Sequence, residues 1–137
     1  MDSKIISTEL RYEAGKTTSL FENRPPVDLV GLKNFEDHPQ EWTPPHLFLA
    51  SIESCFLLTL LSIAEKMRIK IKSFSSTIEG KVSSADGKHQ QVTEIVIRPS
   101  VKTESETDHV KIKMLCEKAE EYCLVARTLN TKVKIEI

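Results

Sequence analysis

The sequence predicts an α+β fold. Segments with the two-residue alternation of strands lie on both sides of one long apolar segment, and a shorter amphipathic helix precedes a last strand. The predicted order is three strands, a long helix, two strands, a helix and a strand, which is typical of the α+β class. The length of 137 residues suits one ordinary domain, so a single domain over residues 1–137 is predicted.

The part of the chain before Thr43 is predicted to form short strands and loops. Alternating apolar residues, a Gly-containing turn and a pair of prolines divide it. The predicted strands are residues 5–12, 17–21 and 27–30, with a turn at 13–16 and a polar loop at 34–43.

A long helix is predicted from Thr43-Pro44 to about Lys66 or Met67. Thr is a favoured N-cap, and Pro at the first helical position gives up only an N–H that would be unpaired anyway. Residues 47–64 approach the length of a membrane span, but Glu53 lies inside them, where a carboxylate costs roughly 2.5–3.5 kcal/mol on insertion scales. A helix in a protein core is therefore predicted, with no membrane partner.

The second half of the chain is predicted to contain a long hairpin, a helix and a last strand. The hairpin joins residues 69–82 and 92–101 through a turn at 83–87, with a bulge or bend between Ile71 and Phe74. Pro99 predicts an edge or a break in the returning strand. The helix begins near Ser105 or Thr107, and residues 131–137 form the last strand. The helix carries one apolar stripe: Ile112, Leu115, Cys116, Ala119, Tyr122 and Cys123.

Composition and charge exclude several classes of partner and site. The 19 Lys and Arg nearly balance the 20 Asp and Glu, and no basic cluster is interleaved with aromatic residues, so nucleic acid is not predicted as a partner. The N-terminus lacks the pattern of a secretory signal, and three cysteines do not suit a disulfide-stapled secreted domain, so a cytoplasmic protein is predicted. Metal-binding and phosphate-binding motifs are missing from the sequence, so no metal and no cofactor are predicted.

The cysteines are the candidate reactive groups. Cys55 lies eleven residues past the helix start, beyond the reach of the helix dipole, so a reactive thiolate there needs a cation brought by the fold. Cys123 lies at the end of the second helix, where a kink could expose it. Cys116 and Cys123 are seven residues apart, about 10 Å along an unbroken helix, which is too far for a disulfide. If a disulfide forms, it could join Cys55 to Cys123 or Cys55 to Cys116, and both pairings remain possible.

Two segments resemble the motifs of the OsmC/Ohr family. Residues 43–56, Thr-Pro-Pro-His-Leu-Phe-Leu-Ala-Ser-Ile-Glu-Ser-Cys-Phe, are similar to the start of the family's central helix. Residues 119–126, Ala-Glu-Glu-Tyr-Cys-Leu-Val-Ala, are similar to its second cysteine motif. The order of the elements matches over nearly the whole chain.

The resemblance implies antiparallel sheets wrapped around a long buried central helix, in an intertwined homodimer. It implies a thiol-dependent peroxidase, in which Cys55 attacks an organic hydroperoxide and Cys123 resolves the sulfenate as a disulfide that a dithiol reductant opens. The family also uses an Arg from the N-terminal strand region to hold the thiolate, for which Arg24 is the first candidate and Arg11 the second.

The sequence departs from the family pattern at several positions. Pro45 stands where the peroxidases carry a Glu, and Leu124 and Ala126 replace the usual Pro and Ser of the second motif. Glu53 is predicted to lie about 160° around the helix from Cys55, as a dimer-interface or core ion-pair residue. His46 is predicted to be a solvated first-turn residue, with an acid/base role as the alternative.

Three functions are compatible with these residues. The first is the peroxidase. The second is a non-peroxidase protein of the same family that binds a small apolar ligand at the dimer interface, which Pro45 favours. The third is a structural domain whose cysteines fill the core. Partial ionisation of Cys55 near neutral pH, within reach of Cys123, is required by the first function alone.

Overall fold

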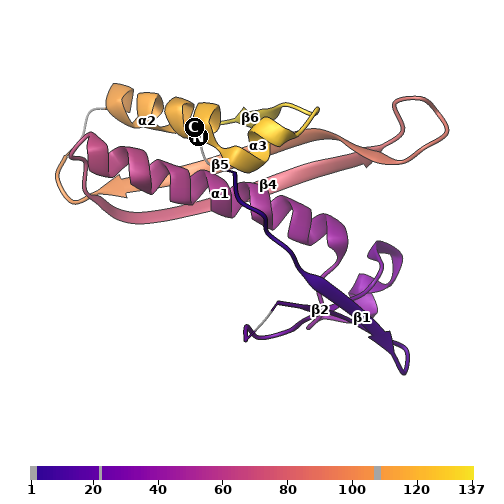
Figure 1. The fold of residues 1–137 in the computed structure, drawn as a ribbon. Coiled ribbons are helices and arrows are strands. Elements are labelled where there is room, and N and C mark those ends of the chain that lie inside the picture. Colours follow the sequence, from indigo (N-terminus) through magenta and orange to yellow (C-terminus); the bar gives the residue numbers. More distant parts are fainter. Residues whose placement is uncertain (1–2, 22, 107–108) are drawn as a thin grey trace. The chain divides into compact units, whose positions relative to one another are not determined.

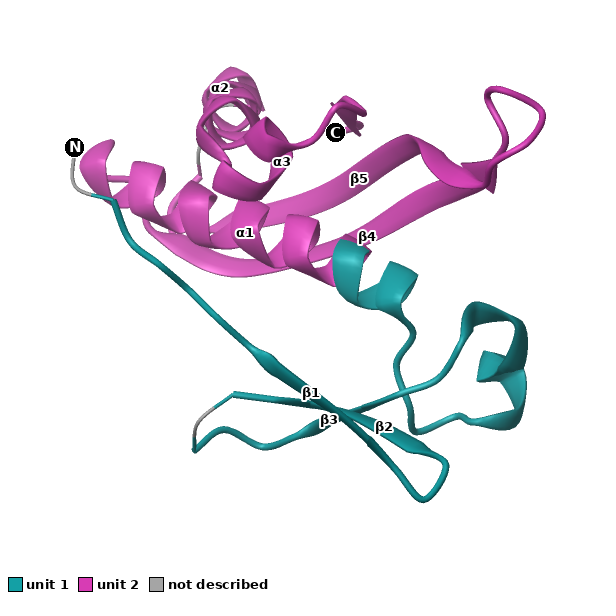
Figure 2. Ribbon diagram, turned by 45° about the vertical axis from the view of Figure 1, so that its right-hand side comes forward, with its two compact units in different colours: residues 1–48 teal, residues 49–137 magenta. Residues whose placement is uncertain are grey.

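The computed structural model describes residues 3–21, 23–106 and 109–137 (Figure 1). The chain forms two compact units, residues 1–48 and residues 49–137 (Figure 2). The helix α1 (Pro44–Lys66) begins in the first unit and continues in the second. A single domain over 1–137 stays a prediction.

The first unit contains a three-stranded antiparallel sheet. Its strands are β1 (Glu9–Glu13), β2 (Lys16–Leu20) and β3 (Val27–Leu29), in that order across the sheet. The predicted turn between β1 and β2 is confirmed, with Ala14 and Gly15 both at positive φ, as a two-residue hairpin turn requires. The predicted polar loop instead includes part of a 3₁₀ helix, η1 (Leu32–Asp37).

The second unit contains a mixed three-stranded sheet and the helices. The long strands β4 (Ile71–Ser83) and β5 (Gln91–Thr103) form an antiparallel hairpin, and β6 (Val133–Ile135) pairs parallel to β5. The helices α2 (His109–Tyr122) and α3 (Leu124–Thr128) lie between β5 and β6 in the chain. The predicted α+β fold with one long helix is confirmed, whereas the parallel pairing of the last strand was not predicted.

The helix α1 lies along β4 in the opposite direction. Leu49 meets Gly80, Glu53 bonds to Ser76, and the Phe56 ring lies 6.3 Å from that of Phe74. These contacts follow the alternation of β4, in which every second residue from Phe74 to Gly80 faces inward. The core between the sheet and the helices consists of Ile52, Phe56, Leu60, Ala64, Ile95, Ile97, Leu115, Cys116, Ala119, Cys123 and Val133.

The start of α1 is as predicted. The Thr43 hydroxyl accepts a hydrogen bond from the backbone N–H of His46 at 3.2 Å, and Pro44 is the first helical residue. The Thr43 hydroxyl also bonds to Nδ1 of His46 at 2.6 Å. At the other end Arg68 takes a positive φ, and the N–H of Ile69 donates back to the carbonyl of Ala64.

The hairpin confirms the predicted irregularity and extends further than predicted. The register shifts between Ile71 and Ser73, inside the interval where the apolar phase changes. The returning strand was predicted over residues 92–101 and runs from Gln91 to Thr103. Pro99 is tolerated because β6 pairs only with residues 95–97 of β5, so that side of the strand is an open edge at Pro99.

The second helix ends inside the second cysteine motif. Thr107 lies outside the described residues, and the described helix starts at His109. It ends at Tyr122, and α3 starts at Leu124. Leu115, Cys116 and Ala119 are buried as the apolar stripe predicts, but Tyr122 is 62% exposed.

Among the described residues, α1 is the one helix long and apolar enough to cross a membrane. One stripe of it packs on the sheet, and the Glu53 carboxylate accepts a hydrogen bond from the Ser76 hydroxyl at 2.5 Å. On this side α1 packs as a helix packs against a sheet in a protein core. Its opposite side still carries exposed leucines, Leu58 at 66% and Leu61 at 40%.

The Glu53–Ser76 bond gives a testable contribution to stability. We expect Ser76→Ala to lower the free energy of unfolding by about 1–2 kcal/mol, because a partly buried carboxylate loses its donor. Chemical denaturation measures this loss. Ser75→Ala is the matched control, since Ser75 is exposed and should leave stability within about 0.5 kcal/mol. Equal effects of the two changes would mean that the bond contributes nothing.

Candidate functional site

The fold brings Cys55 and Cys123 together. Cys55 lies in the middle of α1, and Cys123 is the N-cap of α3, at the junction where α2 ends. Their side chains share a hydrogen bond. The break in the helix was predicted, but Cys123 is 1% exposed, so the break turns it inward toward Cys55 instead of exposing it.

The surroundings of Cys55 favour its thiolate. Burial raises the pKa of the Cys55 thiol, but hydrogen bonds to its sulfur from the backbone of Val125, the side chains of Cys123 and Thr59, and the backbone of Leu124 outweigh burial. The pKa of Cys55 is therefore lowered from its ordinary value. The Thr59 hydroxyl also donates to the Cys55 carbonyl at 2.7 Å, and its single proton cannot serve both acceptors at once. The backbone amides of Leu124 and Val125 are therefore the more constant donors to the Cys55 sulfur.

The other two cysteines have raised pKa values. Burial is the largest cause for Cys123, and the hydrogen bond and charge of Cys55 raise the pKa of Cys123 further. Burial raises the pKa of Cys116 to about 11, with a smaller contribution from the charge of Glu117. Cys55 thus ionises first, while Cys123 stays protonated and donates its S–H to the Cys55 sulfur.

The backbone donors at 124 and 125 were missed by the sequence analysis, which required a cation for Cys55. The signal was present, because Leu124 replaces a proline, and a proline has no N–H to donate. Nothing in the sequence placed this segment beside α1, since the contact depends on the turn between α2 and α3.

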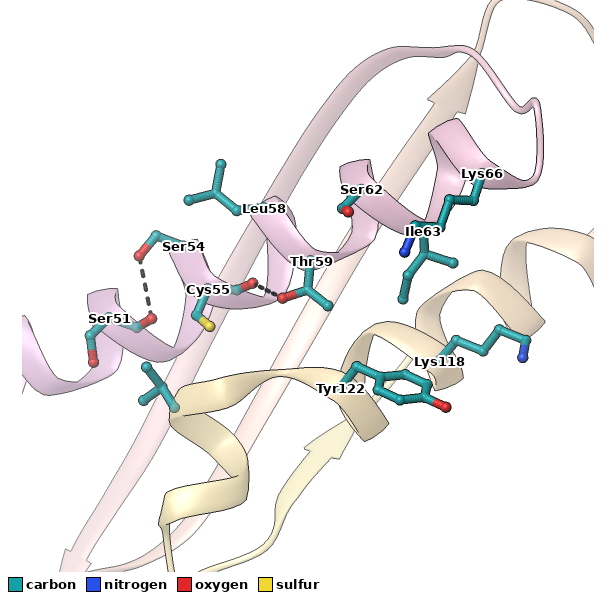
Figure 3. Close-up of a pocket in the computed structure, with 11 residues that line it drawn as sticks. Ser51, Ser54, Cys55, Leu58, Thr59, Ser62, Ile63, Lys66, Lys118 and Tyr122 are labelled. Atoms are coloured by element: carbon teal, nitrogen blue, oxygen red, sulfur yellow. Dashed lines mark hydrogen bonds between the residues drawn. The ribbon is translucent and has the colours of Figure 1, made fainter. Parts of the chain in front are cut away.

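A groove of about 740 Å³ opens beside Cys55, between α1 and the α2–α3 segment (Figure 3). Its exposed wall is mostly carbon. The hydroxyl of Ser54 donates to the carbonyl of Ala50 at 2.7 Å, and that of Thr59 to the Cys55 carbonyl, which explains the apolar wall despite its Ser and Thr residues. The groove is lined by Ser51, Ser54, Cys55, Leu58, Thr59, Ser62, Ile63, Lys66, Lys118, Tyr122 and Val125.

The remaining sequence candidates take separate places. Arg24 and Arg11 belong to the first unit, where the Arg24 guanidinium stacks over the Phe21 ring at 4.5 Å and Arg11 is an exposed residue of β1. Their roles toward Cys55 stay predictions. His46 is exposed, as predicted, and bonds to Thr43. Within the described residues the Glu53 carboxylate accepts a hydrogen bond from the neutral Ser76 hydroxyl and forms no ion pair, and its place at a dimer interface stays a prediction.

Comparison of the sequence with known proteins identifies the family of this chain. Residues 37–137, about three quarters of the chain, match the sequence model of the OsmC-like proteins. The uncharacterized protein YmaD of Bacillus subtilis is 29% identical over 115 residues, which cover 81% of this chain and 76% of YmaD.

Solved structures share the fold over nearly the whole chain. An OsmC-like protein of unknown function from Vibrio cholerae has a TM-score of 0.88 at 22% identity, covering 98% of this chain and 99% of that one. The organic hydroperoxide resistance protein OhrB of Bacillus subtilis has a TM-score of 0.68 at 26% identity, covering 95% of each chain. The resemblance found in the two cysteine motifs is thus confirmed, and the chain belongs to the OsmC-like family.

Proposed function

We propose that this protein is a thiol-dependent peroxidase that reduces organic hydroperoxides. The observation that carries the proposal is that Cys55, a thiol of lowered pKa that lines an open groove, is paired with Cys123, a thiol of raised pKa. The nucleophile of such a peroxidase must be the thiolate, and the resolving group must be a neighbouring thiol. The relative from Bacillus subtilis that is called an organic hydroperoxide resistance protein supports the same activity.

The reaction follows from this arrangement. The Cys55 thiolate attacks the terminal oxygen of the hydroperoxide, the O–O bond breaks, and the leaving alkoxide takes a proton to become an alcohol. Cys55 is then a sulfenic acid. The Cys123 sulfur attacks the Cys55 sulfur, water leaves, and a disulfide forms. A dithiol reductant restores both thiols by exchange and becomes a disulfide itself.

The two thiols lie within hydrogen-bonding reach of each other. Cys123 already contacts Cys55 by a hydrogen bond, and it is the single N-cap residue between α2 and α3. We propose that the α2–α3 junction moves to bring the two sulfur atoms to bonding distance. A reducing cytoplasm, which is the proposed location, keeps such a disulfide transient.

A homodimer is part of the proposal. Exposed apolar side chains occur on α1, at Leu58 and Leu61, and near the N-terminus, where Ile5 is 97% and Ile6 is 92% exposed. Such side chains are normally covered in a stable soluble protein, and a second copy of the chain would cover them. Arg24 stays the proposed cation that would strengthen the Cys55 thiolate.

Peptide mapping after oxidation tests the peroxidase. One equivalent of cumene hydroperoxide is added to the reduced protein, and the free thiols are then alkylated and the peptides identified by mass spectrometry. We expect a Cys55–Cys123 disulfide, which is lost in Cys55→Ser and kept in Cys116→Ser. Three alkylated thiols in the wild-type protein would refute the proposal.

The groove itself supports a second candidate function. Its carbon wall suits a small apolar ligand, and Pro45 stands where the family's peroxidases carry a carboxylate. A non-peroxidase binding protein would keep three free thiols after hydroperoxide treatment and would still bind an apolar ligand in the Cys55→Ser variant. The same mapping experiment therefore separates the two functions.

A further inference from the structure

Thr59 lies one helical turn after Cys55 and has two acceptors on that residue. Its hydroxyl donates to the Cys55 carbonyl at 2.7 Å (Figure 3), and the Cys55 sulfur also lies within reach of a hydrogen bond from it. Residues four positions apart are neighbours on one face of an α-helix, which explains why both acceptors lie beside this side chain. The hydroxyl carries one proton, and rotation about its C–O bond directs that proton to either acceptor.

The bond from the hydroxyl to the carbonyl is one that the helix does not need. In α1 the backbone N–H of Thr59 donates to the carbonyl of Cys55, as the regular pattern of an α-helix requires. The hydroxyl is therefore a second donor to a carbonyl that is already satisfied. An ionised sulfur is the stronger acceptor, because a hydrogen bond to a charged group is about twice as strong as one between neutral groups. Ionisation of Cys55 should therefore turn the hydroxyl proton from the carbonyl to the sulfur.

Thr59 differs from the other donors to this sulfur in its place in the fold. The donors at residues 123–125 all belong to the α2–α3 segment, whereas Thr59 belongs to α1, as Cys55 does. In the resting site the two amides of that segment are the more constant donors, but their positions change when the junction moves. Cys123 also gives up its proton when its sulfur attacks Cys55. Among the described residues that bond to the sulfur, Thr59 is thus the donor that stays beside it throughout the reaction.

We propose that Thr59 is a further catalytic residue, whose hydroxyl turns from the Cys55 carbonyl to the Cys55 sulfur as the thiolate forms and remains its donor while the disulfide is made. The role in disulfide formation rests on the proposed function, whereas the bond to the thiolate does not. Thr59 loses no proton in any step, since its hydroxyl only changes acceptor. The proton of the Cys55 thiol passes to water, the leaving alkoxide takes a proton from water, and the Cys123 proton leaves with the sulfenic hydroxyl as water.

Thr59→Val tests the bond to the thiolate, because it removes the hydroxyl and keeps the branched shape of the side chain. The rate of alkylation of Cys55 by iodoacetamide is measured at a series of pH values. We expect the midpoint to move to higher pH, and the rate below the midpoint to fall about two- to tenfold, the effect of one hydrogen bond. Thr59→Ser keeps the hydroxyl and should behave as the wild-type protein does. An unchanged midpoint in a folded Thr59→Val protein would overturn the proposal.

Thr128→Val is the matched control. The Thr128 hydroxyl donates to the carbonyl of Leu124, four residues earlier in α3, at 2.9 Å, but Thr128 is exposed and does not line the groove. The two substitutions therefore remove the same kind of bond, and only the change at Thr59 removes a donor from the sulfur. Thr128→Val should leave the midpoint of Cys55 unchanged, and thermal unfolding shows that both variants are folded. Equal shifts in the two variants would contradict a specific role for Thr59.

A double variant tests whether Thr59 acts without the α2–α3 segment. In Cys123→Ala/Leu124→Pro two donors of that segment are removed, and adding Thr59→Val should shift the midpoint of Cys55 at least as far as it does alone. Loss of the shift in this background would show that the hydroxyl depends on the segment, against the proposal. In the Cys123→Ala protein, where no disulfide can follow, dimedone traps the Cys55 sulfenic acid formed by cumene hydroperoxide. Thr59→Val should slow this trapping about two- to tenfold.

The two kinds of measurement separate this inference from the proposed function. If the wild-type protein forms no disulfide with hydroperoxide, the peroxidase is refuted, and the alkylation midpoints still decide whether Thr59 donates to the thiolate. If the disulfide forms and the midpoint does not respond to Thr59→Val, the peroxidase stands and the role of Thr59 is refuted.

Discussion

Phe56→Ala is expected to lower the free energy of unfolding by about 3–5 kcal/mol. The Phe56 side chain is 1% exposed, and its ring packs at a 44° tilt against Phe74 of β4. Truncation removes apolar surface from the core and leaves a cavity between α1 and the hairpin, because β4 is held in place by its pairing with β5. Urea denaturation followed by circular dichroism measures the change.

Leu58→Ala provides the control on the same helix. Leu58 is 66% exposed in the single chain, so its truncation should change the free energy of unfolding by no more than about 0.5 kcal/mol. A loss for Leu58 that approaches the loss for Phe56 would contradict this assignment of faces. If that loss depended on protein concentration, it would identify Leu58 as a residue covered by a second copy.

The Phe56→Ala result also concerns the Cys55–Cys123 site, because Phe56 and Cys55 are neighbours on α1. Burial of Phe56 against the sheet fixes the rotation of the helix, and this rotation directs Cys55 toward the α2–α3 segment. The fold and the reactivity of Cys55 therefore share one determinant. A helix that rotated after loss of Phe56 would move the sulfur away from the amides of Leu124 and Val125.

Much of the fold could be predicted because local signals specify it. The N-cap at Thr43, the hairpin turn near Gly15 and the change of apolar phase after Ile71 each act within a few residues. The parallel pairing of β6 with β5 could not be predicted, because it joins segments about 38 residues apart in sequence and nothing local distinguishes parallel from antiparallel partners.

The sequence singles out Cys55 and Cys123 as candidate site residues, but it does not predict the electrostatics of their surroundings. Two cysteines in matching motifs identify Cys55 and Cys123 from the sequence. Their hydrogen bond, and the inward turn of Cys123, depend on how the α2–α3 junction packs on α1, which is a tertiary property. Likewise the bond from the Ser76 hydroxyl to Glu53 depends on the register of β4 against α1, which places a serine there. The groove, too, is lined by residues of α1 and of the α2–α3 segment that are more than 50 positions apart in the chain.

The second large effect is expected in the alkylation of the thiols. With iodoacetamide near pH 8, Cys55 should react about 100-fold or more faster than Cys116, because the pKa of Cys55 lies below its ordinary value of 9.0 and that of Cys116 is about 11. The thiolate is the reacting form, so the rate at Cys55 should rise as the pH passes through its lowered pKa and then level off. Peptide mapping at a series of pH values gives the rate for each cysteine.

Variants at Leu124 and Cys123 assign this lowered pKa to its donors. Cys123→Ala removes the S–H donor, and Leu124→Pro removes one backbone N–H, so each should move the alkylation midpoint of Cys55 to higher pH. Leu124→Ala keeps the N–H and is the matched control, with no expected shift. Proline is well tolerated in the first helical position, which Leu124 occupies in α3, so Leu124→Pro should fold.

The comparison of Leu124→Pro with Leu124→Ala therefore isolates one hydrogen bond at the position where this chain departs from the family motif. A higher midpoint in the proline variant alone would mean that the Leu124 amide helps to hold the thiolate. Leu124 and Pro45 both depart from the family pattern. That outcome would connect the two departures: Leu124 adds a backbone N–H donor for the Cys55 sulfur, in a chain that has Pro45 in place of the family's Glu. Identical midpoints for both variants would leave Val125 and Cys123 as the donors, and would make Arg24 the next residue to test as the source of stabilisation.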